Sequence, residues 1–155
     1  MIKINLVCVG KIKEKYFAEG VTEYTKRLSR FCDFTVTEVA EENLKNPASG
    51  DISGIVRREG ENILPKLCGK VFVLAIEGEK LSSEKFADII KKEKDLGGVI
   101  TFVIGGSYGV SEEVKKRAKL ISFSDMTFPH TLFRLMFTEQ LYRAFCIIGG
   151  TAYHK

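Results

Sequence analysis

Short apolar runs alternate with stretches of helical periodicity along the whole chain, which leaves few folds open. The apolar runs have the length of strands and are rich in β-branched residues; they cover 2–9, 34–39, 71–76, 99–104 and 120–123. The helical stretches that follow them cover 15–30, 51–64, 82–95, a segment after Ser111, and 131–148. This alternation predicts an α/β fold with a mainly parallel sheet flanked by helices.

Local signals refine these elements. Ser82 is expected to cap its helix, Gly78 to end the strand before it, and 43–50 to form a surface loop. The last helical segment, 131–148, is apolar on nearly every side. It therefore either threads through the core or packs against a second subunit, and we expect some of both.

Composition excludes several classes of protein. A length of 155 residues predicts one domain over 1–155, and a net charge of +4 permits a polyanionic partner such as RNA without requiring one. Four scattered cysteines and two histidines predict no metal site. Neither a secretion signal nor an apolar run of about 20 residues is evident, so we expect a soluble cytoplasmic protein without membrane contact.

Ligands of parallel sheets bind at the carboxyl ends of the strands, which directs attention to 74–78, 105–109 and 122–130. Within the second segment, Gly105 to Gly109 matches the G-x-S-x-G pattern of a serine nucleophile, and a Ser107–Asp125–His130 triad can be written down. Asp125 and His130 lie too close in sequence to come from separate strand ends, which weighs against a hydrolase. The glycines otherwise let backbone approach a ligand closely, or simply form a tight turn.

The third segment, 122–130, combines hydroxyl and main-chain groups with aromatic side chains. Its backbone could read an adenine edge while Leu74, Phe123 and Met126 supply apolar walls, as expected for a small-molecule pocket. The plain alternative is an ordinary connection between a strand and a helix.

Several motifs, in order along the whole chain, are similar to those of the ribosomal RNA large-subunit methyltransferase H family. They are Val9-Gly10-Lys11-Ile12-Lys13-Glu14-Lys15-Tyr16, Phe102-Val103-Ile104-Gly105-Gly106-Ser107-Tyr108-Gly109, Ser122-Phe123-Ser124, Thr127-Phe128-Pro129-His130, Glu139-Gln140-Leu141-Tyr142-Arg143-Ala144-Phe145 and Tyr153-His154-Lys155. The resemblance implies a SPOUT methyltransferase with a C-terminal trefoil knot, a homodimer, and S-adenosylmethionine as methyl donor. It also implies the substrate, a pseudouridine in a stem-loop of 23S ribosomal RNA, methylated at N3 in the assembled ribosome.

Carried onto this sequence, the resemblance implies a donor site of main-chain and apolar groups. Its residues are Leu74, Gly105, Gly106, Ser122, Phe123, Ser124, Asp125, Met126 and Thr127. Because the acceptor nitrogen loses a proton, His130 and His154 are candidate bases. Tyr153 could stack on a base after the tail folds over the donor or reaches a partner's pocket.

Arg134 and Arg143 lie on the last helix, and Arg143 is the better candidate for contact with RNA. The alternative is that both are solvent-facing charges without a binding role. The chain shows no dedicated RNA-binding module, so we expect weak action on naked RNA and a need for the folded ribosome. A ribosome-binding factor without chemistry remains the competing hypothesis beside a hydrolase.

Overall fold

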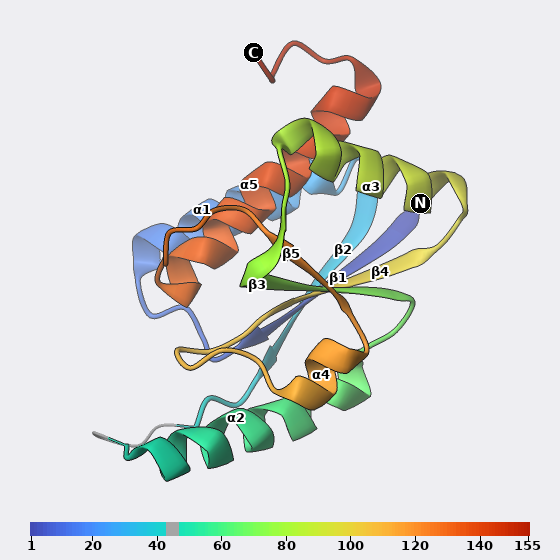
Figure 1. The fold of residues 1–155 in the computed structure, drawn as a ribbon. Helices are drawn as coiled ribbons and strands as arrows, with labels where there is room; N and C mark the ends of the chain where they lie inside the picture. The colour runs from blue at the N-terminus through green and yellow to red at the C-terminus, as the bar shows by residue number, and fades with distance from the viewer. Residues whose placement is uncertain (43–46) are drawn as a thin grey trace.

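Five parallel strands form one sheet in the order β2-β1-β4-β3-β5 in the computed structural model, which describes residues 1–42 and 47–155 (Figure 1). The strands are β1 (Ile2–Val9), β2 (Cys32–Val39), β3 (Lys70–Lys80), β4 (Val99–Ile104) and β5 (Lys119–Ser122). The helices are α1 (Lys15–Leu28), α2 (Ser49–Ile63, followed by a 3-10 turn), α3 (Ser83–Asp95), α4 (Glu112–Lys116) and α5 (His130–Gly149). The predicted mainly parallel α/β sheet is confirmed.

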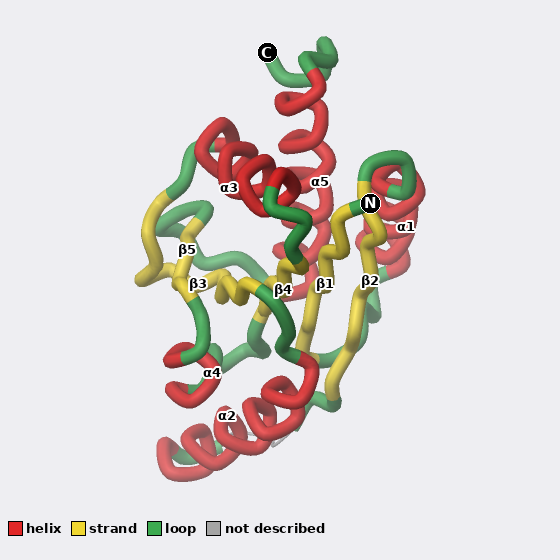
Figure 2. Tube along the Cα trace, turned by 90° about the vertical axis from the view of Figure 1, so that its right-hand side faces the viewer, coloured by secondary structure: helices red, strands yellow, loops and turns green. Residues whose placement is uncertain are grey.

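Helices cover both faces of the sheet, with α1, α3 and α5 on one side and α2 and α4 on the other (Figure 2). Alternate residues of β1 enter the two layers: Ile4 and Leu6 pack towards α5, and Val7 and Val9 towards α2. This division explains why the strands read as continuous apolar runs, since each face of the sheet is buried.

One expectation about β3 is wrong. Gly78 does not end the strand, because β3 runs on to Lys80 and pairs again with β5 there. A Cβ at Gly78 would lie 2.6 Å from the backbone N and C of Ile121, so the glycine allows two main chains to pass in contact. Of the predicted loop over 43–50, residues 43–46 lie outside the described residues and 47–48 belong to no helix or strand, as expected; α2 begins at Ser49, two residues before the predicted start.

Helix α5 lies between α1 and α3 and buries Phe137, Leu141 and Phe145 against the sheet layer. Part of α5 is thus buried in the core as expected, and part of its apolar surface is only half-buried. Its packing against a second subunit stays a prediction. The chain reaches α5 from β5 by the segment 123–129, which crosses between the sheet edge and the helix layer (Figure 1). The trefoil knot stays a prediction. Within the described residues, no helix has the length and apolar character needed to cross a bilayer.

Candidate functional site

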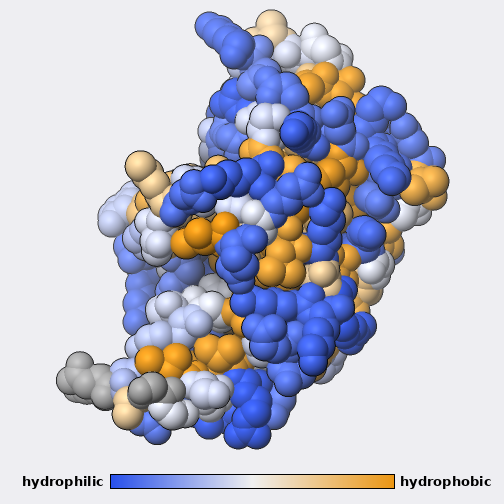
Figure 3. Space-filling model, viewed as in Figure 1, coloured by the Kyte–Doolittle hydropathy of each residue, from blue (hydrophilic) through white to orange (hydrophobic). Residues whose placement is uncertain are grey.

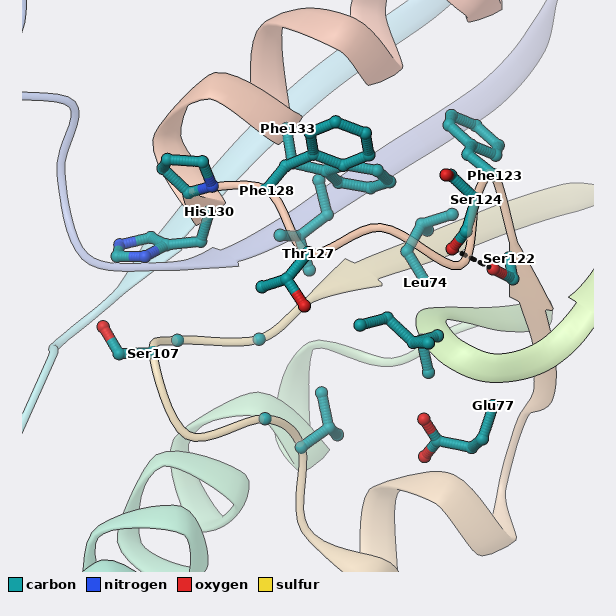
Figure 4. Close-up of a pocket in the computed structure, with 18 of the residues that line it drawn as sticks. Leu74, Glu77, Ser107, Ser122, Phe123, Ser124, Thr127, Phe128, His130 and Phe133 are labelled. Carbon is teal, nitrogen blue, oxygen red and sulfur yellow. Dashed lines mark hydrogen bonds between the residues drawn. The ribbon is translucent and has the colours of Figure 1, made fainter.

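A cavity of about 680 Å³ opens at the carboxyl ends of β3, β4 and β5, where the sequence rule placed it (Figure 4). These three strands are neighbours in the sheet, so the segments that follow them meet. The cavity is lined by 74–77 from β3, 104–110 after β4, 122–124 and 126–130 after β5, Lys115 and Phe133. Its volume lies within the range of about 300–1,000 Å³ that is usual for small-molecule sites.

An irregularity in β3 forms one wall. Leu74 and Glu79 both pair with Ile121 of β5, so the intervening residues leave the ladder and bulge outward. Leu74 and Glu77 on this excursion face the same space as Thr127 from the opposite segment (Figure 4). The sequence indicated the strand end but not this bulge, which depends on pairing with a strand almost fifty residues away.

The turn after β4 forms the second wall. Gly109 N–H donates to the Gly106 carbonyl at 3.2 Å, and Gly109 has a φ of +89°, a conformation that favours glycine. A Cβ at Gly105 would lie 2.9 Å from the carbonyl C and O of Gly109. The glycines thus form a tight turn, and Gly105, Gly106 and Gly109 contribute only main chain to the cavity lining.

The segment after β5 forms the third wall and is held by its own hydroxyls. Ser122 Oγ donates to the Ser124 carbonyl at 2.9 Å, and Met126 N–H donates to Ser124 Oγ at 3.0 Å (Figure 4). The Phe123 ring packs on Phe133 with centroids 5.4 Å apart, which ties this segment to α5. A polar, largely main-chain wall next to aromatic rings suits a flat heteroaromatic ligand.

Not every predicted donor-site residue lines the cavity. Leu74, Gly105, Gly106, Ser122, Phe123, Ser124, Met126 and Thr127 do so. Asp125 does not appear among the lining residues; its carboxylate pairs with Lys80 of β3 instead. Met126 is 71% exposed, so it lies at the rim rather than in the wall. The space-filling view shows apolar side chains gathered on this face over β3, β5 and α5 (Figure 3).

Two charged side chains at the cavity were missed by sequence reasoning. Lys115 Nζ lies 2.7 Å from Glu77 Oε1, and this hydrogen bond holds the pKa of the Glu77 carboxyl below its usual value. Lys115 belongs to α4 and Glu77 to β3, so only the folded chain brings them together. The pair supplies a fixed anion and cation at the floor of the site.

The four candidate catalytic residues fall into two separate groups. His130 lines the cavity, whereas Arg143, Tyr153 and His154 gather at the other end of α5. Thirteen residues of helix separate His130 from Arg143, which corresponds to roughly 20 Å. Within one chain the tail therefore does not reach the cavity.

The tail residues form a connected polar cluster. Tyr153 Oη donates to Glu139 Oε1 at 3.0 Å, and Arg143 Nε donates to the same oxygen at 3.1 Å. His154 Nδ1 lies 3.1 Å from Arg143 Nη1, and His154 Nε2 lies 2.8 Å from Glu84 Oε1 of α3. Because arginine only donates, Nδ1 accepts and Nε2 carries the proton towards Glu84. Burial and its phenol and carboxylate neighbours raise the pKa of Tyr153.

Arg134 is not the solvent-facing charge that the alternative interpretation expected. Its side chain is 3% exposed, Nη1 lies 2.6 Å from Glu38 Oε2, and Nη2 donates to the Gly10 carbonyl at 3.0 Å. It joins the first turn of α5 to the ends of β1 and β2. Arg134 is therefore a structural residue that sets the position of the helix carrying His130.

The geometry disfavours a serine hydrolase. Ser107 is exposed on the turn, and its hydroxyl points away from Leu74, Glu77 and Ser122 (Figure 4). The carboxylate that a triad would need, Asp125, is engaged by Lys80. No group of three or more potential metal-ligating side chains occurs among residues 1–42 and 47–155.

Comparisons with known proteins agree with the motifs. A family model described as "Predicted SPOUT methyltransferase" matches residues 2–154. Relatives from Streptococcus mutans and Carboxydothermus hydrogenoformans are each 49% identical, and one from Streptococcus gordonii is 50% identical, over 99% of this chain and the whole of each relative. All three are named "Ribosomal RNA large subunit methyltransferase H". The stated resemblance is confirmed, and the chain belongs to the SPOUT methyltransferase family.

Proposed function

We propose that this methyltransferase uses S-adenosylmethionine to methylate N3 of a pseudouridine in a stem-loop of 23S ribosomal RNA, in the assembled ribosome of the cytoplasm. The cavity at the ends of β3, β4 and β5 carries the proposal, because it combines a suitable volume with main-chain donors and acceptors and apolar walls. The printed names of relatives that align over their whole length support the choice of RNA as substrate.

The residues around the cavity fit the proposed donor. Leu74 and Phe123 would hold the adenine between apolar surfaces, and the main chain of 122–127 would read its edge. The turn from Gly105 to Gly109 exposes backbone that a ligand can approach closely. Asp125 belongs at most to the rim in this proposal, since it pairs with Lys80.

The bound donor supplies an electrophilic methyl group on a sulfonium, and the protein contributes mainly alignment of the reactants. The three walls would fix the donor, while the acceptor ring enters from the open side near Met126 and His130. His130 is the candidate for accepting the N3 proton from its place at the first residue of α5. A water next to His130 serves the same role if the ring does not reach N3 directly.

We further propose that the chain acts as a homodimer. A second cavity of about 500 Å³ lies between α1, α3 and α5, and it is lined largely by half-buried apolar side chains: Leu81, Phe123, Leu132, Leu135 and Met136. A dimer formed over this surface would cover apolar area that a single chain leaves open. It would also let the tail cluster of Arg143, Tyr153 and His154 serve a partner's donor cavity, which it does not reach in its own chain.

The decisive test is transfer of radiolabelled methyl from S-adenosylmethionine to ribosomes from a strain that lacks the gene, with the modified nucleoside identified by mass. We expect one methyl per ribosome on a pseudouridine, and much weaker transfer to naked 23S RNA. Ribosomes from the wild-type strain are the control, since their site is already modified. Ribosome binding without methyl transfer would instead identify a binding factor and refute the proposal.

A further inference from the structure

A buried glutamate lies directly behind the glycine turn of the donor cavity. Glu59, on α2, is 3% exposed. A Cβ built on Gly106 would lie 3.1 Å from Glu59 Oε1 and 3.3 Å from Oε2, so the carboxylate occupies the space that a side chain at this position would need. Gly106 itself lines the cavity, whereas Glu59 does not. In the proposed complex, Gly106 would therefore stand between this carboxyl and the ligand.

The Glu59 carboxyl has few hydrogen-bond and ion-pair partners among the described residues for a group so deeply buried. Oε2 accepts a hydrogen bond from the Glu42 N–H at 3.2 Å, while Oε1 has no hydrogen-bond partner among the described residues. The nearest cation on its own helix, Arg58, lies 3.5 Å from the Glu42 carboxylate instead. Buried carboxylates normally have a paired cation or a full set of hydrogen bonds, so this one calls for a functional explanation.

The surroundings favour the neutral form of Glu59 in the free protein. Burial raises its pKa, and the neighbouring carboxylates of Glu41 and Glu42 raise it further, against a lowering by the Glu42 N–H. Val9 of β1, the other side chain beside the Gly106 Cβ position, carries no charge. A positive charge brought into the cavity would be the missing partner and would favour the ionised form.

We propose that Glu59 is a specificity-determining residue that recognises the positive sulfonium of the methyl donor through Gly106 and so favours donor over demethylated product. The inference rests on the proposed use of S-adenosylmethionine. The donor and S-adenosylhomocysteine share the adenosine, the amino group and the carboxylate, but only the donor carries the sulfonium charge. Release of the product after transfer would then follow from the loss of this attraction.

The expected size of the effect follows from the separation. A cation in contact with the cavity side of Gly106 would lie roughly 7 Å from the Glu59 carboxylate, allowing for two van der Waals contacts. At the effective dielectric constant of about 20 that is usual near protein sites, and with part of the attraction screened by solvent, removing the charge should weaken donor binding about tenfold.

The test is calorimetric titration of both ligands into the full-length protein and into Glu59→Gln. The amide has nearly the same shape and keeps an oxygen for the Glu42 N–H, so only the charge is removed. Glu61→Gln is the matched control, because Glu61 lies on the same helix but is exposed and contacts Arg57. We expect Glu59→Gln to lose about tenfold in affinity for S-adenosylmethionine and less than about twofold for S-adenosylhomocysteine, and Glu61→Gln to change neither.

Two other results would overturn the inference. An equal loss of affinity for both ligands would mean that Glu59 acts only by holding the turn. No loss of affinity for either ligand would mean that the charge of Glu59 does not contribute to binding in the cavity. If the wild-type protein binds neither ligand, the proposed donor itself is wrong, which is a distinct outcome.

A measurement on the wild-type protein covers the case of a variant that does not fold. Because a cation favours ionised Glu59, donor binding should release a proton, and the ratio of donor to product affinity should rise as pH increases above the usual range of glutamate. A ratio that is flat from pH 5 to 8, with binding otherwise intact, would contradict the proposal.

Discussion

Replacing Gly105 by alanine tests whether the tight turn after β4 creates the donor cavity. The new Cβ would lie 2.6 Å from Val110 Cγ2 and 2.9 Å from both the C and the O of Gly109. Rotation of a side chain relieves only the first contact. The other two are with backbone in a turn closed by the Gly109 N–H and the Gly106 carbonyl, so the turn itself must move.

The magnitude follows from these contacts. Overpacking at a site where backbone must shift costs about 1–3 kcal/mol, and two of the three close contacts here are with backbone, which places Gly105→Ala near 2–3 kcal/mol. Because the turn lines the cavity, its displacement should also weaken binding of S-adenosylmethionine by at least about tenfold, equivalent to about 1.4 kcal/mol.

Urea unfolding gives the stability loss, and calorimetric titration gives the loss of affinity. The control is Gly149→Ala, whose Cβ would meet only Thr151 Oγ1 at 3.7 Å, an ordinary contact, at the end of α5. We expect it to leave both quantities nearly unchanged. Val110→Ala in the Gly105→Ala background removes the one side-chain contact but also truncates a buried core residue, so it should recover neither the stability nor the affinity.

A Gly105→Ala protein as stable as wild type, within about 0.5 kcal/mol, would refute the steric reasoning. Full affinity for S-adenosylmethionine in Gly105→Ala would show that the turn is not a wall of the proposed donor site.

The remaining predictions concern α5, the tail, Glu59 and Ser107. Arg134→Met should lower the free energy of unfolding by about 2–3 kcal/mol, less than for a fully buried pair because Glu38 is over a third exposed; a loss below about 0.5 kcal/mol would contradict its structural role. Deletion of 153–155 should abolish most methyl transfer to ribosomes while leaving donor affinity within about twofold, because the tail lies away from the cavity of its own chain and in a partner's site Tyr153 is proposed to stack on the substrate base rather than to hold the donor; an equal loss of donor affinity would instead make the tail part of the donor-binding wall. Glu59→Gln should raise the free energy of unfolding, relative to wild type, by more at pH 8 than at pH 4, because a carboxyl whose folded pKa is raised above 4.5 costs stability as pH rises through that range; the same difference between variant and wild type at both pH values would argue against a buried ionisable Glu59. Ser107→Ala should retain methyl transfer, and the wild-type protein should resist a fluorophosphonate probe; labelling of Ser107 would revive the hydrolase alternative.

The sequence was sufficient to predict the layers and the place of the cavity, because both follow from local pattern. Buried parallel strands must be apolar on both faces, so β1 and β4 were predicted with the observed bounds. The rule that ligands bind at the carboxyl ends of strands then located the three segments that line the cavity.

Features that depend on partners distant in sequence were missed. Gly78 looked like the end of a strand because nothing local indicates that the main chain of Ile121 passes beside it. The ion pair between Asp125 and Lys80, 45 positions away, also could not be predicted from the local sequence. The burial of Arg134 likewise depends on Glu38, 96 positions away.

The positions of the candidate catalytic residues could also be predicted only in part. His130 could be placed at the cavity because it follows the segment after β5 directly. Tyr153 and His154 could be placed only relative to the end of α5, and their contacts with Glu139 and with Glu84 of α3 appear only in the fold. Their proposed role therefore requires a second chain.

A crystal structure of the protein with S-adenosylhomocysteine tests the whole account most directly. We expect the adenine between Leu74 and the main chain of 122–127, with the homocysteine portion passing the turn at Gly105 and Gly106. Electron density for the nucleoside in the second cavity, between α1, α3 and α5, would contradict the assignment of the donor site. An empty first cavity at saturating ligand would contradict it as well.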